Sequence, residues 1–276
     1  MANPDHDAIS YTALKVLQQR ARNCTIPMCR EMAEAAGISW KSGWVRERLR
    51  ALIGGKVRSG LYLQLRHDAI SRALDDYPGC AILELAAGFG TRGVVEHPHR
   101  QAYIETELHD LLARKKEVVR RLGHGRIAPN HHFLPLNVTS AGDMQRAGDF
   151  IAGLGLTKPV AVIHEGLLMY LSAQEQEQVR DGIRGLMQSH KPGVVWLTPD
   201  FSERNIDHTL LQRLMSFRLG QRVGRRLSYF PDNDAVVRFL KAGNLDCEWL
   251  PNIAGAADVR TRNYAEYFRV HRITMR

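Results

Sequence analysis

The residues with the most chemical content follow a short apolar run over 81–85. Glu84 lies near the end of this run and is followed by the small-residue turn 86–90. Small residues after a buried strand let the backbone approach a nucleotide-like cofactor at the carboxyl edge of an α/β sheet. The dinucleotide fingerprint G-x-G-x-x-G would need glycine where the chain has Ala86 and Thr91. Glu84 instead suits a positively charged cofactor, and S-adenosylmethionine carries an ammonium and a sulfonium group. The alternative is a small-residue turn that binds no ligand.

Two further predicted strands end in polar side chains that face the same sheet edge. Glu107 follows the second strand, at roughly the 20-residue distance at which an acidic side chain reaches ribose hydroxyls. A carboxylate accepts two hydrogen bonds from such a diol. Asn137 follows the strand over 133–136, and its amide can pair with the edge of adenine. Two alternatives stay open: Glu107 as a solvated carboxylate at a helix start, and Asn137 as the cap of a turn.

A fourth strand, over 160–163, ends in His164-Glu165-Gly166 and leads to Tyr170. His164 is either a catalytic base or a buried histidine with its hydrogen bonds satisfied, and the second interpretation is favoured. The pairs His97/His99 and His131/His132 suggest a metal, but no carboxylate or cysteine stands at ligand spacing. We therefore interpret these four as loop histidines and expect no metal site.

The elements that must position these residues alternate from residue 80 onward. Strand, helix and strand follow one another in the pattern typical of a parallel sheet with helices on both faces. The sequence therefore predicts an α/β, Rossmann-like fold. Strands are expected over 81–85, 102–105, 133–136, 160–163 and 194–197, helices over 108–122, 173–190 and 232–242, and an antiparallel closing pair over about 245–250 and 264–272. Ser172 and Glu175 form a predicted capping box at the start of the second helix.

Two segments depart from the alternation. Residues 7–60 are predicted to be helical, followed by a helix over 61–75, and we expect residues 1–76 to form an N-terminal helical cap over the carboxyl edge. The second domain is then the Rossmann-like unit over 77–276. An arginine-rich insertion over 201–231, after the fifth strand, is predicted to act as a lid that shapes the acceptor pocket.

Composition narrows the class of partner. Of the 276 residues 44% are hydrophobic, and no apolar run approaches the ~20 residues of a membrane span. The formal net charge of +9 invites a nucleic-acid partner, but no basic strand interleaved with aromatic residues is present in the sequence. We expect a small-molecule acid as substrate, no nucleic acid, no membrane, and a monomer or homodimer.

Cysteine usage and the N-terminus bear on location. The four cysteines lack C-x-x-C spacing, which favours reduced thiols. The first residues lack the basic start and the apolar stretch of a signal peptide. We expect a cytoplasmic protein.

Several motifs, in order, resemble the leucine carboxyl methyltransferase family. The resemblance covers most of residues 7–200. It rests on Glu84-Leu-Ala-Ala-Gly-Phe-Gly-Thr-Arg92, on Tyr103-Ile-Glu-Thr-Glu-Leu108 with Arg114-Lys115, and on Val162-Ile-His-Glu-Gly-Leu-Leu-Met-Tyr-Leu171. Asp7-Ala-Ile-Ser-Tyr-Thr-Ala-Leu14 with Arg20, and Leu197-Thr-Pro-Asp200, are similar to the polyketide-tailoring branch typified by tetracenomycin carboxyl methyltransferase. The chain departs from the family pattern at Ala86, Gly90, Glu107 and Asn137, and the second and fourth of these remove a carboxylate.

This resemblance implies the fold of a class I methyltransferase and a set of site residues. The implied cofactor is S-adenosylmethionine, which leaves as S-adenosylhomocysteine. Its implied ligands are Arg20, Glu84, Ala86, Gly88, Arg92, Glu107, Asn137 and Glu165, with Arg20 and Arg92 on the methionine carboxylate. Implied acceptor-binding residues are Tyr170, Arg204, Arg218 and Arg222, and the residues implied nearest the chemistry are Tyr170, Glu165 and His164.

The activity that the resemblance implies is methyl transfer to a carboxylate or phenolic oxygen of a small molecule. A carboxylate is already ionised near pH 7 and needs no base, so the expected product is the methyl ester of a polyketide-like or other secondary-metabolite acid. The enzyme's task is then positioning and exclusion of water. Two alternatives stay open: a phenol O-methyltransferase of the same fold, and a non-catalytic protein that binds S-adenosylmethionine.

Overall fold

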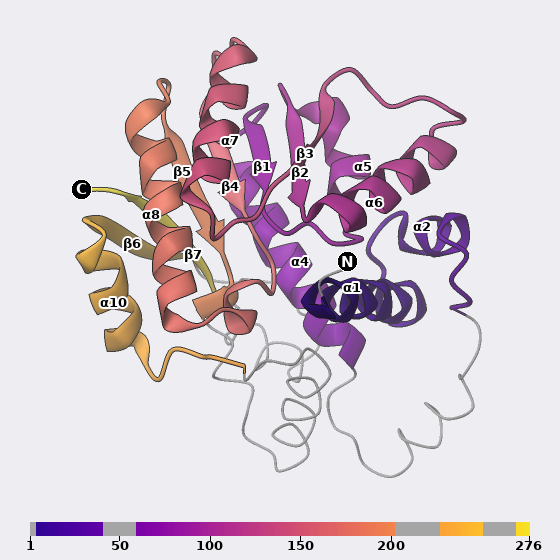
Figure 1. Cartoon of the computed structure of the whole chain (residues 1–276), viewed down its shortest axis with the longest axis horizontal. Coiled ribbons are helices and arrows are strands. Elements are labelled where there is room, and N and C mark those ends of the chain that lie inside the picture. The colour runs from indigo at the N-terminus through magenta and orange to yellow at the C-terminus, as the bar shows by residue number, and fades with distance from the viewer. Residues whose placement is uncertain (1–3, 41–58, 202–226, 251–268) are drawn as a thin grey trace.

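A seven-stranded sheet organises the molecule. The computed structural model of the chain describes residues 4–40, 59–201, 227–250 and 269–276 (Figure 1). The strand order is β3-β2-β1-β4-β5-β7-β6. The first five strands pair in parallel, and β7 pairs antiparallel with both β5 and β6. The strands are β1 Ala81–Glu84, β2 Tyr103–Glu107, β3 His131–Pro135, β4 Val160–Ile163, β5 Val194–Thr198, β6 Leu245–Leu250 and β7 Val270–Met275.

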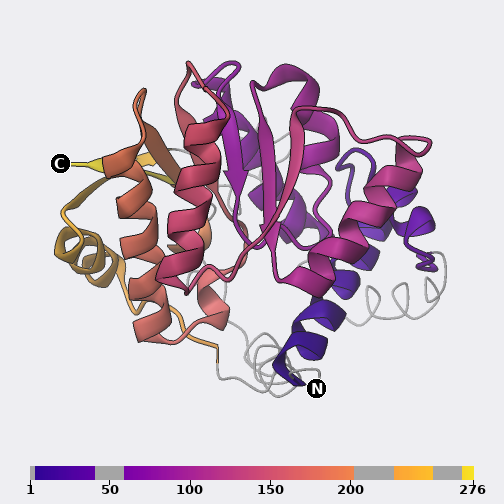
Figure 2. The same cartoon turned by 45° about the horizontal axis from the view of Figure 1, so that its top comes forward.

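Helices cover both faces of this sheet (Figures 1 and 2). They are α1 Pro4–Asn23, α2 Cys29–Ala35, α4 Ser59–Asp75, α5 Arg92–Glu96, α6 His109–Leu122, α7 Ala141–Gly153, α8 Ala173–Ser189 and α10 Asn233–Ala242, with 3-10 turns η1 His97–His99 and η2 Leu168–Tyr170. Side chains from α7, α8 and α10 pack in one core cluster with one face of the sheet. Side chains from α4 pack on the opposite face. The predicted Rossmann-like α/β fold is confirmed.

The central strands form because their sequences are apolar throughout. All four residues of β1 and all four of β4 are buried, as expected for parallel strands covered on both faces. The helices that return the chain have explicit start signals. Ser172 accepts from the backbone N–H of Glu175 at the start of α8, and the predicted capping box is present. Gly243 ends α10, also as predicted.

One helix has no predicted counterpart, and two predicted features differ in part from the structure. Helix α7 has no strong signal in the sequence, because its thirteen residues include glycines at 142, 148 and 153, which weaken helix propensity. His131 and His132 lie in β3 rather than in a loop, so that strand begins before residue 133. The last strand, β7, spans 270–275, and the part of its predicted range at 264–268 lies outside the described residues.

The N-terminal helices take two different positions. Helix α1 crosses the carboxyl edge of the sheet, where Ala13 Cβ lies 3.5 Å from the position that a Cβ on Gly88 would occupy (Figure 2). Helix α4 instead packs on the face of the sheet through Ala69, Ile70 and Leu74. The division into a cap over 1–76 and a domain over 77–276 stays a prediction, although α4 belongs with the sheet by its contacts. Most of the predicted lid, at 202–226, lies outside the described residues.

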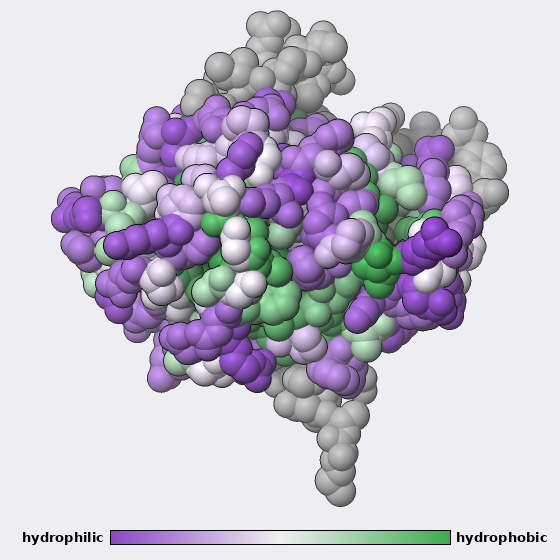
Figure 3. All heavy atoms as spheres, turned by 90° about the horizontal axis from the view of Figure 1, so that it is seen from above, coloured by the Kyte–Doolittle hydropathy of each residue, from purple (hydrophilic) through white to green (hydrophobic). Residues whose placement is uncertain are grey.

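Surface character is mixed. Seen from above, one face shows apolar residues gathered near its middle and polar residues around them (Figure 3). No helix among the described residues combines the length and the apolar character that crossing a bilayer requires. Cytoplasmic location stays a prediction.

The turn after β1 leads to a stability prediction. Ala86 has a left-handed backbone with φ 51°, which costs a residue with a Cβ roughly 1–2 kcal/mol, whereas glycine carries no such cost but loses about 0.4–1 kcal/mol through its more flexible unfolded chain. We expect Ala86→Gly to leave the free energy of unfolding unchanged or to raise it by up to about 1 kcal/mol, measured by urea denaturation. Ala113→Gly, on the exposed side of α6, is the matched control and should lower it by about 1 kcal/mol. Equal losses in the two variants would contradict the assignment of strain to Ala86.

Candidate active site

A buried carboxylate lies at the centre of the site. Glu165 follows β4, and its carboxylate is surrounded by three guanidinium groups. Arg20 Nη2 donates to Glu165 Oε1, Arg66 Nε lies 3.6 Å from the same oxygen, and Arg92 Nη2 lies 3.7 Å from Oε2. All four side chains are at most 9% exposed. Burial alone would raise the pKa of Glu165, but the guanidiniums, Arg20 foremost, hold that pKa below its usual value.

The three arginines of this cluster, called the arginine cluster below, come from separate elements. Arg20 lies in the last turn of α1, Arg66 lies within α4, and Arg92 opens α5. Gly166 makes the close approach of Arg66 possible, because a Cβ at this position would lie 2.5 Å from Arg66 Nη2. Gly166 also has φ 76°, a left-handed conformation that favours glycine. The loop after β4 and the helices before β1 are therefore fitted to one another.

The arginine cluster has a buried donor that Glu165 does not occupy. Arg20 Nε is buried with no hydrogen-bond partner among the described residues. A buried guanidinium donor and a buried carboxylate each favour a partner of opposite charge, and guanidinium binds a carboxylate with paired hydrogen bonds. An amino-acid zwitterion meets both demands, because its carboxylate matches the arginines and its ammonium matches Glu165. The residues present therefore fit the methionine end of S-adenosylmethionine.

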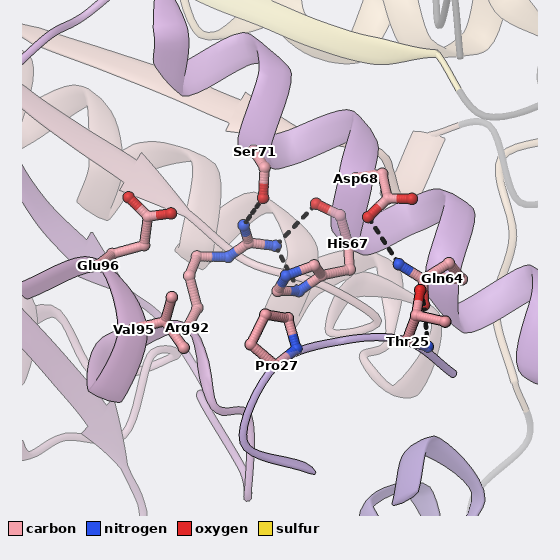
Figure 4. Close-up of a pocket in the computed structure, with 9 residues that line it drawn as sticks. All are labelled: Thr25, Pro27, Gln64, His67, Asp68, Ser71, Arg92, Val95 and Glu96. Carbon is pink, nitrogen blue, oxygen red and sulfur yellow. Dashed lines mark hydrogen bonds between the residues drawn. The ribbon is translucent and has the colours of Figure 1, made fainter. Parts of the chain in front are cut away.

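Arg92 is also anchored on the side away from Glu165 (Figure 4). Its Nη2 donates to the backbone carbonyl of His67 at 3.0 Å and lies 3.0 Å from His67 Nδ1, and its Nη1 donates to Ser71 Oγ. Burial and then the charge of Arg92 lower the pKa of His67 far below its ordinary value, so this ring is neutral and accepts from the guanidinium. Arg92 thus forms part of the wall of a cavity of about 400 Å³ between α4 and α5.

The turn after β1 is held by Glu107. Its Oε2 accepts from the N–H of Gly88 at 3.0 Å and its Oε1 accepts from the N–H of Leu108 at 2.9 Å. Glu107 is 6% exposed, so the alternative of a solvated carboxylate is wrong. The side chain lies directly beside the glycine turn, where the ribose of a cofactor is expected. Its contact with the ribose stays a prediction.

Glu84 lies beneath the same turn. It accepts from the Tyr103 hydroxyl at 2.7 Å, and burial raises its pKa above the usual value. Gly90 faces this region: a Cβ there would lie 3.0 Å from the Ala87 carbonyl oxygen, 3.6 Å from Glu84 Oε1 and 3.7 Å from Arg20 Nη1, so a side chain would be tight. The predicted contact between Glu84 and the cofactor is not tested by this geometry.

Sequence reasoning missed a second buried network below the turn. Lys115 of α6 forms an ion pair with Glu105 of β2, and His131 Nε2 lies 2.7 Å from Glu105 Oε1. Lys115 Nζ also donates to the Ala87 carbonyl at 3.4 Å. The positive charge of Lys115 and the bond to His131 outweigh burial and keep the pKa of Glu105 below its usual value. The one sequence signal for this network is Glu105, a charged residue inside a predicted strand. All five residues of β2 are buried, and a buried carboxylate needs a partner.

Asn137 and His164 have structural partners. Asn137 Oδ1 accepts from the N–H and the hydroxyl of Thr139 at 3.1 and 2.8 Å, so Asn137 caps this turn, and its contact with adenine stays a prediction. His164 is fully buried, with Nδ1 2.9 Å from an Asp200 oxygen and Nε2 accepting from Trp196 Nε1 at 2.9 Å. Both ring nitrogens are occupied, which supports the structural interpretation of His164 and leaves neither nitrogen for a substrate.

The predicted acceptor side is described only in part. Tyr170 ends η2 and is half-buried, and its role toward an acceptor stays a prediction. Arg204, Arg218 and Arg222 lie outside the described residues. Arg66, which no motif singled out, belongs to the site with Arg20, Arg92 and Glu165.

The fold is Rossmann-like, and the match to a family model adds that the chain is a methyltransferase. Residues 27–184 match the family model described as leucine carboxyl methyltransferase, which is more than half of the chain. The chain therefore belongs to the leucine carboxyl methyltransferase family, and its cofactor is S-adenosylmethionine.

Solved structures resemble the chain in fold at low identity. A methyltransferase from Anabaena variabilis is 11% identical, with 76% of this chain and 85% of that chain covered and a TM-score of 0.49. Magnesium protoporphyrin IX methyltransferase from Synechocystis, with bound S-adenosylhomocysteine, is 11% identical, with 85% and 95% covered and a TM-score of 0.46. No curated protein matches the sequence.

Replacing Glu107 tests the turn side of the site. We expect Glu107→Ala to weaken S-adenosylhomocysteine binding by about 1.5–3 kcal/mol, because hydrogen bonds to a charged group are lost, with isothermal calorimetry as the measurement. Glu117→Ala on the exposed part of α6 removes the same charge away from the turn and should leave affinity unchanged. An unaltered dissociation constant in a folded Glu107→Ala protein would remove Glu107 from the cofactor site.

Proposed function

We propose that the chain transfers the methyl group of S-adenosylmethionine to a carboxylate oxygen of a small-molecule acid and releases a methyl ester. The observation that carries the proposal is the occupation of His164. A phenol, with a pKa near 10, needs a base, and both nitrogens of the histidine at this sheet edge are bonded to Asp200 and Trp196. A carboxylate acceptor needs no such base. Membership of a carboxyl methyltransferase family supports the same acceptor.

The chain's residues act by positioning. When bound, the cofactor supplies an electrophilic methyl group on a sulfonium. The arginine cluster and Glu165 fix the amino-acid end, and Glu107 and the Gly88 turn fix the nucleoside end. Helix α1 lies across the turn and keeps water from this edge of the sheet. Fixing the reactants in line and drying the site lower the barrier without proton transfer by the protein.

The acceptor class follows from charge and from the motifs. Arginines of the insertion, at 204, 218 and 222, are assigned to the acceptor's carboxylate because guanidinium pairs with it through two hydrogen bonds. Tyr170 is assigned to the same group. The motifs at 7–14 and 197–200 favour a polyketide-like or other secondary-metabolite acid. A cytoplasmic monomer or homodimer without a nucleic-acid or membrane partner accords with this role.

A product and pH analysis tests the proposal. Small aromatic, polyketide and short-chain acids are incubated with enzyme and cofactor, and mass spectrometry identifies a gain of one methyl. We expect a product that mild hydroxide hydrolyses, as an ester requires. The rate should fall as pH drops through the acceptor's own pKa and stay level through about 6.5, the ordinary histidine value.

Three outcomes would contradict it. A methyl ether that resists hydroxide indicates a phenol acceptor. A rate that rises with an ionisation near 6.5 indicates a histidine base. Tight S-adenosylhomocysteine binding without turnover of any acid favours the non-catalytic alternative.

A further inference from the structure

We propose that Asp200 is a positioning residue for the amino-acid end of the cofactor, because it holds the loop that presents Glu165 to the arginine cluster. The inference rests on the proposed placement of the zwitterion between Glu165 and the arginines. Asp200 makes no described hydrogen bond to the cofactor turn. It acts on the site through the loop after β4, which it binds directly, and through its electrostatic interaction with Arg66.

The carboxylate of Asp200 binds that loop through consecutive backbone donors. Oδ1 accepts from the N–H of Gly166 at 2.7 Å, and Oδ2 accepts from those of Leu167 and Leu168 at 2.7 and 3.0 Å. The loop has left the sheet ladder at this point, so these buried N–H groups need a partner of this kind. The Asp200 side chain is fully buried. One side chain at the end of β5 thus fixes three successive residues after β4.

His164, the residue before Glu165 in the sequence, binds the same Asp200 carboxylate. The indole N–H of Trp196 is a donor only, so His164 Nε2 accepts from it at 2.9 Å and the ring proton lies on Nδ1. That Nδ1–H donates to Asp200 Oδ2 at 2.9 Å. The backbone N–H of Asp200 donates to Thr198 Oγ1 at 3.1 Å, which orients the residue itself.

Glu165 lies between two of the residues that the Asp200 carboxylate binds. His164 precedes it and Gly166 follows it, so both neighbours are tied to a single buried carboxylate. Arg66 packs against Gly166, which links this loop directly to the arginine cluster. Burial alone would raise the pKa of Asp200, but His164, Arg66 and the backbone donors keep it well below its usual value, so the carboxylate stays ionised.

Binding of two ligands that differ only at the amino-acid end distinguishes a positioning role of Asp200 from a general effect on folding stability. S-adenosylhomocysteine has the amino acid, whereas 5′-methylthioadenosine keeps the adenosine and the thioether and lacks it. Measured by calorimetry, Asp200→Asn should weaken S-adenosylhomocysteine about tenfold, the loss of a charge-assisted hydrogen bond, and should change methylthioadenosine by less than about twofold. Asp232→Asn, which removes the carboxylate that caps α10, is the matched control and should change neither.

A double-mutant cycle tests whether Asp200 affects cofactor binding by positioning Glu165. Glu165→Gln alone should weaken S-adenosylhomocysteine, and adding Asp200→Asn should weaken it by no more than about a further twofold, because coupled residues are not additive. If Asp200→Asn does not fold, Thr198→Val withdraws the hydroxyl that binds Asp200 and should show the same selectivity at smaller size.

Equal weakening of both ligands, unchanged S-adenosylhomocysteine affinity, or full additivity with Glu165→Gln would overturn the role of Asp200. These binding measurements need no acceptor, so a failure of ester formation is recorded separately. A wild-type protein that binds the two ligands equally would instead overturn the zwitterion placement itself.

Discussion

The ion-pair cluster at Glu165 is the constraint on which the site depends. A carboxylate buried without partners is strongly unfavourable, and so is a buried guanidinium, with losses of about 3–5 kcal/mol when one partner is removed. Because Arg20, Arg66 and Arg92 come from α1, α4 and α5, the cluster fixes three helices relative to the end of β4. It also leaves Arg20 Nε without a hydrogen-bond partner among the described residues. The same four side chains therefore hold the helices together and form the proposed site for the amino-acid end of the cofactor.

A second buried polar network fixes the backbone of the glycine turn from below. Lys115, Glu105 and His131 are buried together between β2, β3 and α6, and Lys115 also binds the Ala87 carbonyl. Beside them Glu84 accepts from Tyr103. Such networks are stabilising only when their members are satisfied, and they specify one arrangement of the backbone. The turn can therefore hold Ala86 in a left-handed conformation, because its surroundings determine the path of the chain.

Much of the fold was predictable because buried parallel strands are apolar throughout, and β1, β4 and β5 lie where the sequence places them. Helix α7 is not predictable because its glycines weaken the helical signal. The histidines in β3 resemble loop residues in sequence, and the buried partner of His131, Glu105, is known only from the structure. Arg66 has no local motif, and only the packing of α4 brings it to Glu165. The sequence leaves the roles of Asn137 and His164 open, because their partners Thr139, Asp200 and Trp196 meet them only in the folded chain.

A crystal structure with bound S-adenosylhomocysteine tests the position of the amino-acid end most directly. We expect the ligand's α-carboxylate within hydrogen-bond distance of Arg20, Arg66 or Arg92, its amino group beside Glu165, and the nucleoside at the Gly88 turn. Bound ligand whose amino-acid end lies away from Glu165 and all three arginines would contradict this placement.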